Sequence, residues 1–380
     1  MRYLLAIMGI FVLVTSVIVC GDTGEEPGTR SLLVVVESSL REPLRASLEQ
    51  YTETMALARY EVYVVPWVPE SAGEREKLLE LKTLLFEYVD SHGIEGALLV
   101  GDLPVAMYRM PEGYREEFPT ELFLQGRDAR VVDTDNDGYF DAHTEFEVDI
   151  YTSRLIGTPT QLEKYFARLE KYRREGPLVE RSAFIFIDDD WSGKCTSDAF
   201  RLSQLYSEVD CIQEKSESSL ENYLERLTGE GAEFVYQWVH GAPPGTYSGW
   251  LAFDHLEDQD KLRAIDIIAG NLKASFVNMA NCYGARFTDA QLSVAEAYTV
   301  GTDYGLAVIG STKIGAVADP RLFHESLAKG MRWGEAYKAW FNAEGMKNEY
   351  WHLGIVLMGD PLLRVTGDRF PAGPSPEATP

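Results

Sequence analysis

The sequence is poor in cysteine and in positive charge. Its 380 residues include four cysteines, which excludes a fold held together by dense disulfides. Lysine and arginine number 35 against 60 aspartates and glutamates, so the net charge is −25. Nucleic acid is therefore not expected as a partner, because its phosphates would be repelled. Hydrophobic residues still make up 45%, enough to bury the core of one large or two smaller α/β domains.

Long apolar runs are also scarce, and the clearest one lies at the N-terminus. Arg2 precedes 17 uncharged residues, Tyr3–Val19, which fall short of the roughly 20 that span a bilayer. We interpret residues 1–20 as an export signal. Cys20 stands where a bacterial lipoprotein signal places its lipidated cysteine, although Val19 is atypical before it. A plain cleaved signal or an uncleaved anchor are the alternatives. Each places the mature chain outside the cytoplasm, with membrane attachment only through the N-terminus.

Downstream of this segment, short apolar runs alternate with segments of helical periodicity. Strands are predicted at 31–37, 60–67, 96–102, 148–155, 183–189, 233–240, 274–282 and 305–312. Helices are predicted near 43–59, 74–91, 160–174, 196–208, 217–228, 258–270, 290–302 and 321–344. This alternation predicts an α/β fold with mostly parallel sheets covered by helices on both faces.

A helix-breaking Gly176-Pro177 pair divides this pattern into two units. We expect a linker over 21–30, an N-terminal α/β subdomain over 31–178 and a second, catalytic α/β subdomain over 179–366. The two subdomains are expected to pack together. Residues 367–380 are rich in proline and lack apolar periodicity, so a disordered tail is expected there.

Two reactive side chains end predicted strands of the second unit. His240 is followed by Gly241, and Cys282 comes 42 residues after the histidine, which leaves room for one crossover helix. Reactive groups collect at the carboxyl ends of strands in open α/β sheets. A thiol beside an imidazole suits nucleophilic acyl transfer, and the N–H groups of Gly241 and Cys282 could hold an oxyanion. The alternative is a buried apolar cysteine and a structural histidine.

Four stretches resemble the gingipain family of cysteine peptidases, which have a caspase-type fold. FVYQWVHG and FVNMANCYG are similar to the family blocks that end in the catalytic histidine and cysteine. SVAEAYTVGTDYGLAVIGST resembles the helix and strand that follow, and LGIVLMGDPLLRV resembles the strand that closes the domain. The resemblance covers residues 30–366. It implies an exported endopeptidase that cleaves polypeptides through Cys282, His240 and a thioester acyl-enzyme.

The same resemblance suggests an acid that orients the histidine. In gingipains this acid begins a strand that continues with three apolar residues, glycine and arginine. The corresponding stretch here is DIYTSR, so Asp149 is the candidate, and Ser153 replaces the glycine. A surface acid at a strand start is the alternative. No counterpart was found for the acid that selects arginine in the family's primary pocket, so arginine specificity is not expected to carry over.

Two other functions are compatible with these residues. A sortase-like transpeptidase would use the same dyad but resolve the acyl-enzyme with an amine. A catalytically silent, calcium-stabilised domain could bind partners at the cell surface.

The segment DTDNDGYFD, residues 133–141, predicts a calcium loop. Asp133, Asp135, Asp137 and Asp141 can converge on a hard cation. Thr144 stands where an EF-hand needs glutamate, so the loop would be of another kind, and a solvated acidic turn is the alternative. The Ca²⁺ would be structural, and no catalytic cofactor is expected.

The two remaining cysteines, Cys195 and Cys211, are 16 residues apart in a chain predicted to be exported. A disulfide between them is predicted, with two reduced buried thiols as the alternative. The disulfide would leave Cys282 free.

Overall fold

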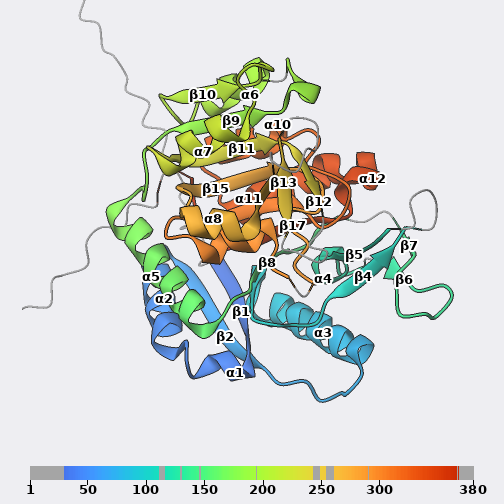
Figure 1. Cartoon of the computed structure of the whole chain (residues 1–380). Helices are drawn as coiled ribbons and strands as arrows, with labels where there is room; N and C mark the ends of the chain where they lie inside the picture. The colour runs from blue at the N-terminus through green and yellow to red at the C-terminus, as the bar shows by residue number, and fades with distance from the viewer. Residues whose placement is uncertain are drawn as a thin grey trace, which may run out of the picture.

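Ten strands form one sheet through the middle of the molecule (Figure 1). The computed structural model describes residues 30–110, 116–128, 131–144, 147–193, 195–242, 249–253, 261–289, 291–365 and 367. The predicted export signal, the linker up to residue 29 and the tail beyond 367 lie outside these residues. The strands of the sheet are β1 (Arg30–Glu37), β2 (Tyr60–Trp67), β3 (Ile94–Val100), β8 (Tyr151–Leu155), β9 (Ala183–Ile187), β10 (Val209–Ile212), β11 (Ala232–Trp238), β15 (Ala274–Ala280), β16 (Ala307–Ser311) and β17 (Ile355–Gly359).

The strand order is β10-β9-β11-β15-β16-β17-β8-β3-β1-β2. β16 and β17 run antiparallel, and every other neighbouring pair in this sheet is parallel. The sheet therefore consists of two parallel blocks of opposite direction. The carboxyl ends of β9, β11, β15 and β16 lie on the same rim as the amino ends of β17 and β8.

Helices cover both faces of the sheet, which confirms the predicted α/β class (Figure 1). On one face, Val235 and Val277 pack with residues of α7 and α8. On the other, Phe234 and Phe276 pack against Trp333 of α11, with ring centroids 6.2 and 5.5 Å apart. The longer helices are α2 (Arg45–Leu57), α3 (Glu74–His92), α5 (Pro159–Glu175), α6 (Cys195–Leu202), α7 (Leu220–Thr228), α8 (Ala264–Gly270), α10 (Arg321–Ala328) and α11 (Trp333–Glu344).

Three predicted helices differ from the structure. Within the segment 258–270, residues 261–263 form the strand β14, and helix α8 begins at Ala264. The segment 321–344 forms two helices, because Gly330 adopts a φ of 83° and turns the chain between α10 and α11. The segment 290–302 forms the short α9 (Val294–Glu296) followed by a π-helical turn, η3 (Ala297–Gly301). The remaining short helices are α1 (Ser38–Arg41), α4 (Leu122–Gln125), α12 (Glu349–His352) and the 3-10 turns η1 (Asp189–Trp191) and η4 (Gly345–Asn348).

One small sheet lies at the rim where β11 ends, and two more form in the segment between β3 and β8. β12 (His240–Ala242), β13 (Trp250–Ala252) and β14 (Lys261–Arg263) form an antiparallel sheet directly after β11. The segment between β3 and β8 contains the pairs β4 (Ala106–Arg109) with β5 (Glu117–Thr120), and β6 (Val131–Val132) with β7 (Ala142–His143). No helix within the described residues is long and apolar enough to cross a membrane.

A histidine is buried in the core that supports β11 and β15. His324 of α10 is fully buried between the rings of Phe234 and Tyr236, at 5.5 and 5.2 Å. Its Nε2 lies 3.0 Å from the Asn278 amide nitrogen. Burial lowers the pKa of His324 to about 3, and the charge of Arg201 acts in the same direction. The imidazole is therefore neutral in the folded chain at neutral pH.

This burial predicts a loss of stability in acid. Below about pH 6.5, the ordinary histidine pKa, His324 binds a proton in the unfolded chain but not in the folded chain. The free energy of unfolding therefore falls as pH drops toward 3. Between about pH 7 and 5.5, urea denaturation should show a decline about 1 kcal/mol larger for wild type than for His324→Gln. An equal decline in both would contradict the prediction.

Candidate active site

His240 and Cys282 follow adjacent parallel strands, β11 and β15. The strands pair in a register that sets Trp238 opposite Ala280. Two residues further along each chain are His240 and Cys282, so the imidazole and the thiol leave the sheet at the same level of neighbouring strands. The structure thus places the two residues predicted as a dyad just past the ends of neighbouring strands.

A turn after β9 contacts the imidazole of His240. The Asp190 carboxylate lies 2.9 Å from His240 Nε2, and the Trp191 ring lies with its centroid 4.6 Å from the imidazole. The side chain of Asp188, just before the turn, accepts the backbone N–H of Asp190 at 3.2 Å. With Nε2–H donated to Asp190, Nδ1 is the nitrogen that can exchange a proton with a thiol.

Asp149, the acid predicted to orient His240, lies elsewhere. Its carboxylate accepts the backbone N–H of Arg127 at 2.6 Å. Asp149 precedes β8, which is four strands from β11, a separation of about 19 Å at the usual spacing of strands. The prediction for Asp149 is corrected accordingly, and Asp190 is the carboxylate at the imidazole. The acidic run after AFIFI, at the end of a predicted strand, was the feature that could have indicated it.

A disulfide anchors the segment that carries this turn. Cys195, at the start of α6, is bonded to Cys211 of β10, with Cα atoms 6.4 Å apart, which confirms the predicted pairing. The Gln213 side chain accepts the backbone N–H groups of Gly193 and Cys195 at 2.9 and 3.2 Å. These contacts tie the residues after Trp191 to the edge strand. Cys282 is a free cysteine.

The thiol of Cys282 is mostly buried beside a buried ion pair. Lys313 Nζ lies 3.3 Å from Glu116 Oε2, and both side chains are almost inaccessible to solvent. Burial raises the pKa of the Cys282 thiol, and the negative charge of Glu116 raises it further. A hydrogen bond from the Gly315 backbone N–H and the positive charge of Lys313 act in the opposite direction. The net direction is upward, so the resting group is a thiol rather than a thiolate.

Gly241 is in close contact with the backbone of Cys282. A Cβ at this position would lie 2.3 Å from the Cys282 carbonyl oxygen, so no side chain fits. The absence of a side chain lets the backbone after His240 lie directly against the backbone of Cys282.

The predicted calcium ligands form a separate cluster in the segment between β6 and β7. Carboxylate oxygens of Asp133, Asp135 and Asp137 lie within 4.8 Å of one another, a spacing that fits a hard cation. Asp141 does not join this group, because its carboxylate accepts the backbone N–H of Thr134 at 3.0 Å and the Thr134 hydroxyl. Three of the four predicted carboxylates therefore converge.

Two arginines compete with a cation for the same carboxylates. Arg75 lies 2.8 Å from Asp133, and Arg109 forms an ion pair with Asp137. They lower the repulsion among the acids without a metal.

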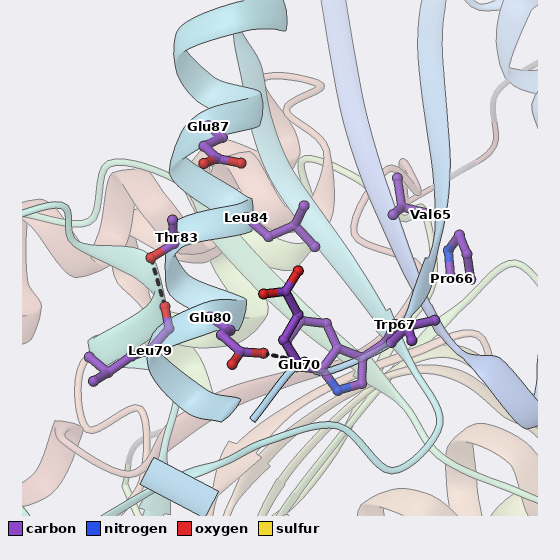
Figure 2. A pocket seen from close by; sticks show the side chains of 10 residues that line it. Val65, Pro66, Trp67, Glu70, Leu79, Glu80, Thr83, Leu84 and Glu87 are labelled. Carbon is purple, nitrogen blue, oxygen red and sulfur yellow. Dashed lines mark hydrogen bonds between the residues drawn. The ribbon is translucent and has the colours of Figure 1, made fainter. Parts of the chain in front are cut away.

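A groove of about 480 Å³ lies between the edge strand β2 and helix α3 (Figure 2). Trp67 and Leu84 form part of its apolar wall, and Glu80 accepts the backbone N–H of Glu70 at 2.9 Å. β2 is at the opposite edge of the sheet from the block that holds His240. This groove is therefore not part of the candidate active site.

Comparison with known proteins gives a match to a family model and matches to solved structures. The family model described as peptidase family C25 matches residues 31–366. A solved structure, the complex of the pro- and mature domains of RgpB from Porphyromonas gingivalis, is similar with a TM-score of 0.63 and 14% identity, over 88% of this chain and 79% of that chain. At this identity the likeness concerns the fold, which is of the predicted caspase-like type. No curated protein matches the sequence.

The buried thiol predicts a high-pH alkylation profile. Because the pKa of Cys282 is raised, its rate of alkylation by iodoacetamide should still be rising above about pH 8.5, the ordinary thiol value. Glu116→Gln removes one charge that raises this pKa, so its midpoint should lie lower. Mass spectrometry of the Cys282 peptide measures both rates. A wild-type midpoint at or below the ordinary value, or no shift in the variant, would contradict this account.

Proposed function

The chain belongs to peptidase family C25, the gingipain family of cysteine peptidases, and we propose that it is an endopeptidase that hydrolyses peptide bonds through Cys282 and His240. The observation that supports this proposal is the register of β11 and β15, which puts His240 and the free cysteine Cys282 just past the ends of neighbouring strands. Asp190, at 2.9 Å from the imidazole, completes a triad.

The reaction has two stages. In the first, the Cys282 sulfur attacks the substrate carbonyl while His240 accepts the thiol proton, since burial keeps the thiol protonated until attack. The backbone N–H groups of Gly241 and Cys282 donate hydrogen bonds to the oxyanion. Collapse of this intermediate breaks the C–N bond, and His240 returns the proton to the leaving amine. A thioester remains on Cys282.

In the second stage, His240 removes a proton from water, which attacks the thioester. The C–S bond breaks, the new carboxylic acid leaves, and Cys282 regains its proton. Asp190 stabilises the imidazolium that forms in each stage, because a carboxylate at hydrogen-bond distance favours the charged ring.

We propose polypeptides as the substrates and a site of action outside the cytoplasm. The support for export is the apolar run before Cys20, which also offers the one route we propose for membrane attachment. The net charge of −25 should favour the approach of basic polypeptides over acidic ones.

Three variants test the proposed mechanism. Cys282→Ala should abolish cleavage of a peptide library while circular dichroism stays unchanged. Asp190→Asn should lower kcat by roughly 10- to 100-fold, part of what general acid–base catalysis contributes. Asp149→Asn is the matched control and should retain activity, because its carboxylate contacts Arg127 instead of His240.

Full activity in Cys282→Ala would refute the nucleophile. Equal effects of the two aspartate variants would refute the role of Asp190. Products joined to an added amine, found by mass spectrometry, would favour transpeptidation over hydrolysis.

We also propose that Asp133, Asp135 and Asp137 bind a structural Ca²⁺. The support is the convergence of their carboxylates within 4.8 Å, on a turn where Gly138 adopts a φ of 97°. The ion would fix the segment between β6 and β7, and it has no part in the reaction.

Calcium removal should lower thermal stability. For a site with a Kd near 0.1 mM, 1 mM Ca²⁺ contributes about 1.4 kcal/mol, which corresponds to roughly 1–3 °C in Tm for a chain of this size. Chelation should therefore lower the Tm of wild type, whereas Asp135→Asn should have a low Tm that does not respond to Ca²⁺. A wild-type Tm independent of Ca²⁺ would refute the site.

A further inference from the structure

We propose that Asn281 is a positioning residue that locks the strand end bearing His240 to the turn bearing Cys282, and that a buried chain of hydrogen bonds holds its side chain. This inference rests on the proposed dyad and deepens it. Asn281 follows β15 directly, and its side chain is 3% exposed. It precedes the nucleophile, so its movement would be transmitted to Cys282 through the backbone.

The Asn281 side-chain amide forms hydrogen bonds with Cys282 and with Gln237. Its Nδ2 donates to the Cys282 carbonyl at 3.2 Å, and its Oδ1 accepts from Gln237 Nε2 at 3.3 Å. Gln237 belongs to β11, three residues before His240. The side chain therefore links the strand of the histidine to the peptide group of the cysteine.

The same amide nitrogen also fills the space between two glycines. A Cβ at Gly241 would lie 2.8 Å from Asn281 Nδ2, and a Cβ at Gly284 would lie 2.3 Å from it. Both backbones are thus pressed against one polar atom, one from the His240 side and one from the Cys282 side. The amide acts as a spacer that sets how far apart the two segments lie.

Three further buried groups fix which way this amide points. The Tyr223 hydroxyl donates to Gln237 Oε1, so Gln237 must present its NH₂ group to Asn281. Because the Tyr223 proton is used in this way, Tyr298, at 2.6 Å, donates to the Tyr223 oxygen. A single direction of donation therefore runs from Tyr298 to the Cys282 carbonyl. Gln237, Tyr223 and Tyr298 are all fully buried, so water cannot replace a lost partner.

The peptide group held by these hydrogen bonds is followed by a residue in an unfavourable backbone conformation. Tyr283, directly after the nucleophile, adopts a φ of 59°, an unfavourable conformation for a residue other than glycine. Its N–H donates to the Lys313 carbonyl at 2.9 Å. With the Cys282 carbonyl held by Asn281, both sides of the Cys282–Tyr283 peptide are fixed, and the thiol is fixed relative to His240.

The test measures how strongly His240 accelerates alkylation of Cys282, because this readout needs no peptide substrate. In the wild-type chain, His240→Ala should slow alkylation at neutral pH by about tenfold, since the imidazole no longer accepts the thiol proton. In an Asn281→Ala background, the same replacement should change the rate by less than about twofold, because the two groups are no longer held together.

A second pair of variants removes only hydroxyl groups. Tyr223→Phe interrupts the chain of hydrogen bonds at its middle, so it should lower the effect of His240 on the alkylation rate of Cys282. It should also lower kcat for peptide cleavage by about tenfold with KM unchanged. Tyr236→Phe is the matched control. Tyr236 precedes Gln237 in β11 and its hydroxyl is also buried, but this hydroxyl is not part of the chain of hydrogen bonds. It should leave both readouts unchanged.

The outcomes separate the two proposals. If His240→Ala has no effect in the wild-type chain, the dyad and the positioning role both fail. If the effect of His240 persists in Asn281→Ala and in Tyr223→Phe, only the positioning role fails. Circular dichroism and Tm establish which variants are folded. If Asn281→Ala does not fold, the result for Tyr223→Phe decides whether the positioning role holds.

Discussion

The parallel pairing of β11 with β15 is the constraint on which the site depends. Both strands are completely buried, so a slip of one residue would turn every apolar side chain to the other face and is strongly disfavoured. The same register sets the imidazole level with the thiol. Burial of the sheet thus enforces the geometry that the chemistry needs, before any contact between the reactive groups themselves.

The register positions His240 and Cys282, whereas the charged groups around them come from other parts of the fold. The carboxylate of Asp190 comes from a third strand and is anchored through the disulfide to a fourth, β10. The ion pair of Lys313 and Glu116 lies beside the thiol, and its two charges shift the pKa of the thiol in opposite directions. Burial therefore dominates at Cys282 and keeps its side chain in the neutral thiol form.

The sequence predicted the strands that carry the dyad, because β11 and β15 are long apolar runs that each end in a reactive residue. Their separation of 42 residues also indicated that these two strands are neighbours, but the order of the other strands across the sheet could not be predicted. Asp149 lies in one predicted strand and Asp190 directly follows another, and only the strand order places Asp190 at the imidazole and Asp149 about 19 Å away. Short elements such as β10 and β12–β14 were missed because three or four residues show no periodicity. For Asp141, spacing predicted proximity, but Thr134 competes for its carboxylate.

The reversal of direction at β17 has a consequence for biosynthesis. β17 lies between β16 and β8, so it is the strand that joins the strands of residues 30–155 to those of residues 183–311. It is also the last strand of the chain described here. On the ribosome each half can begin to form its own part of the sheet, but the two parts share backbone hydrogen bonds only after residues 355–359 have been synthesised. A nascent chain that ends before this point would have an unpaired edge at β16 and another at β8, and open strand edges promote aggregation.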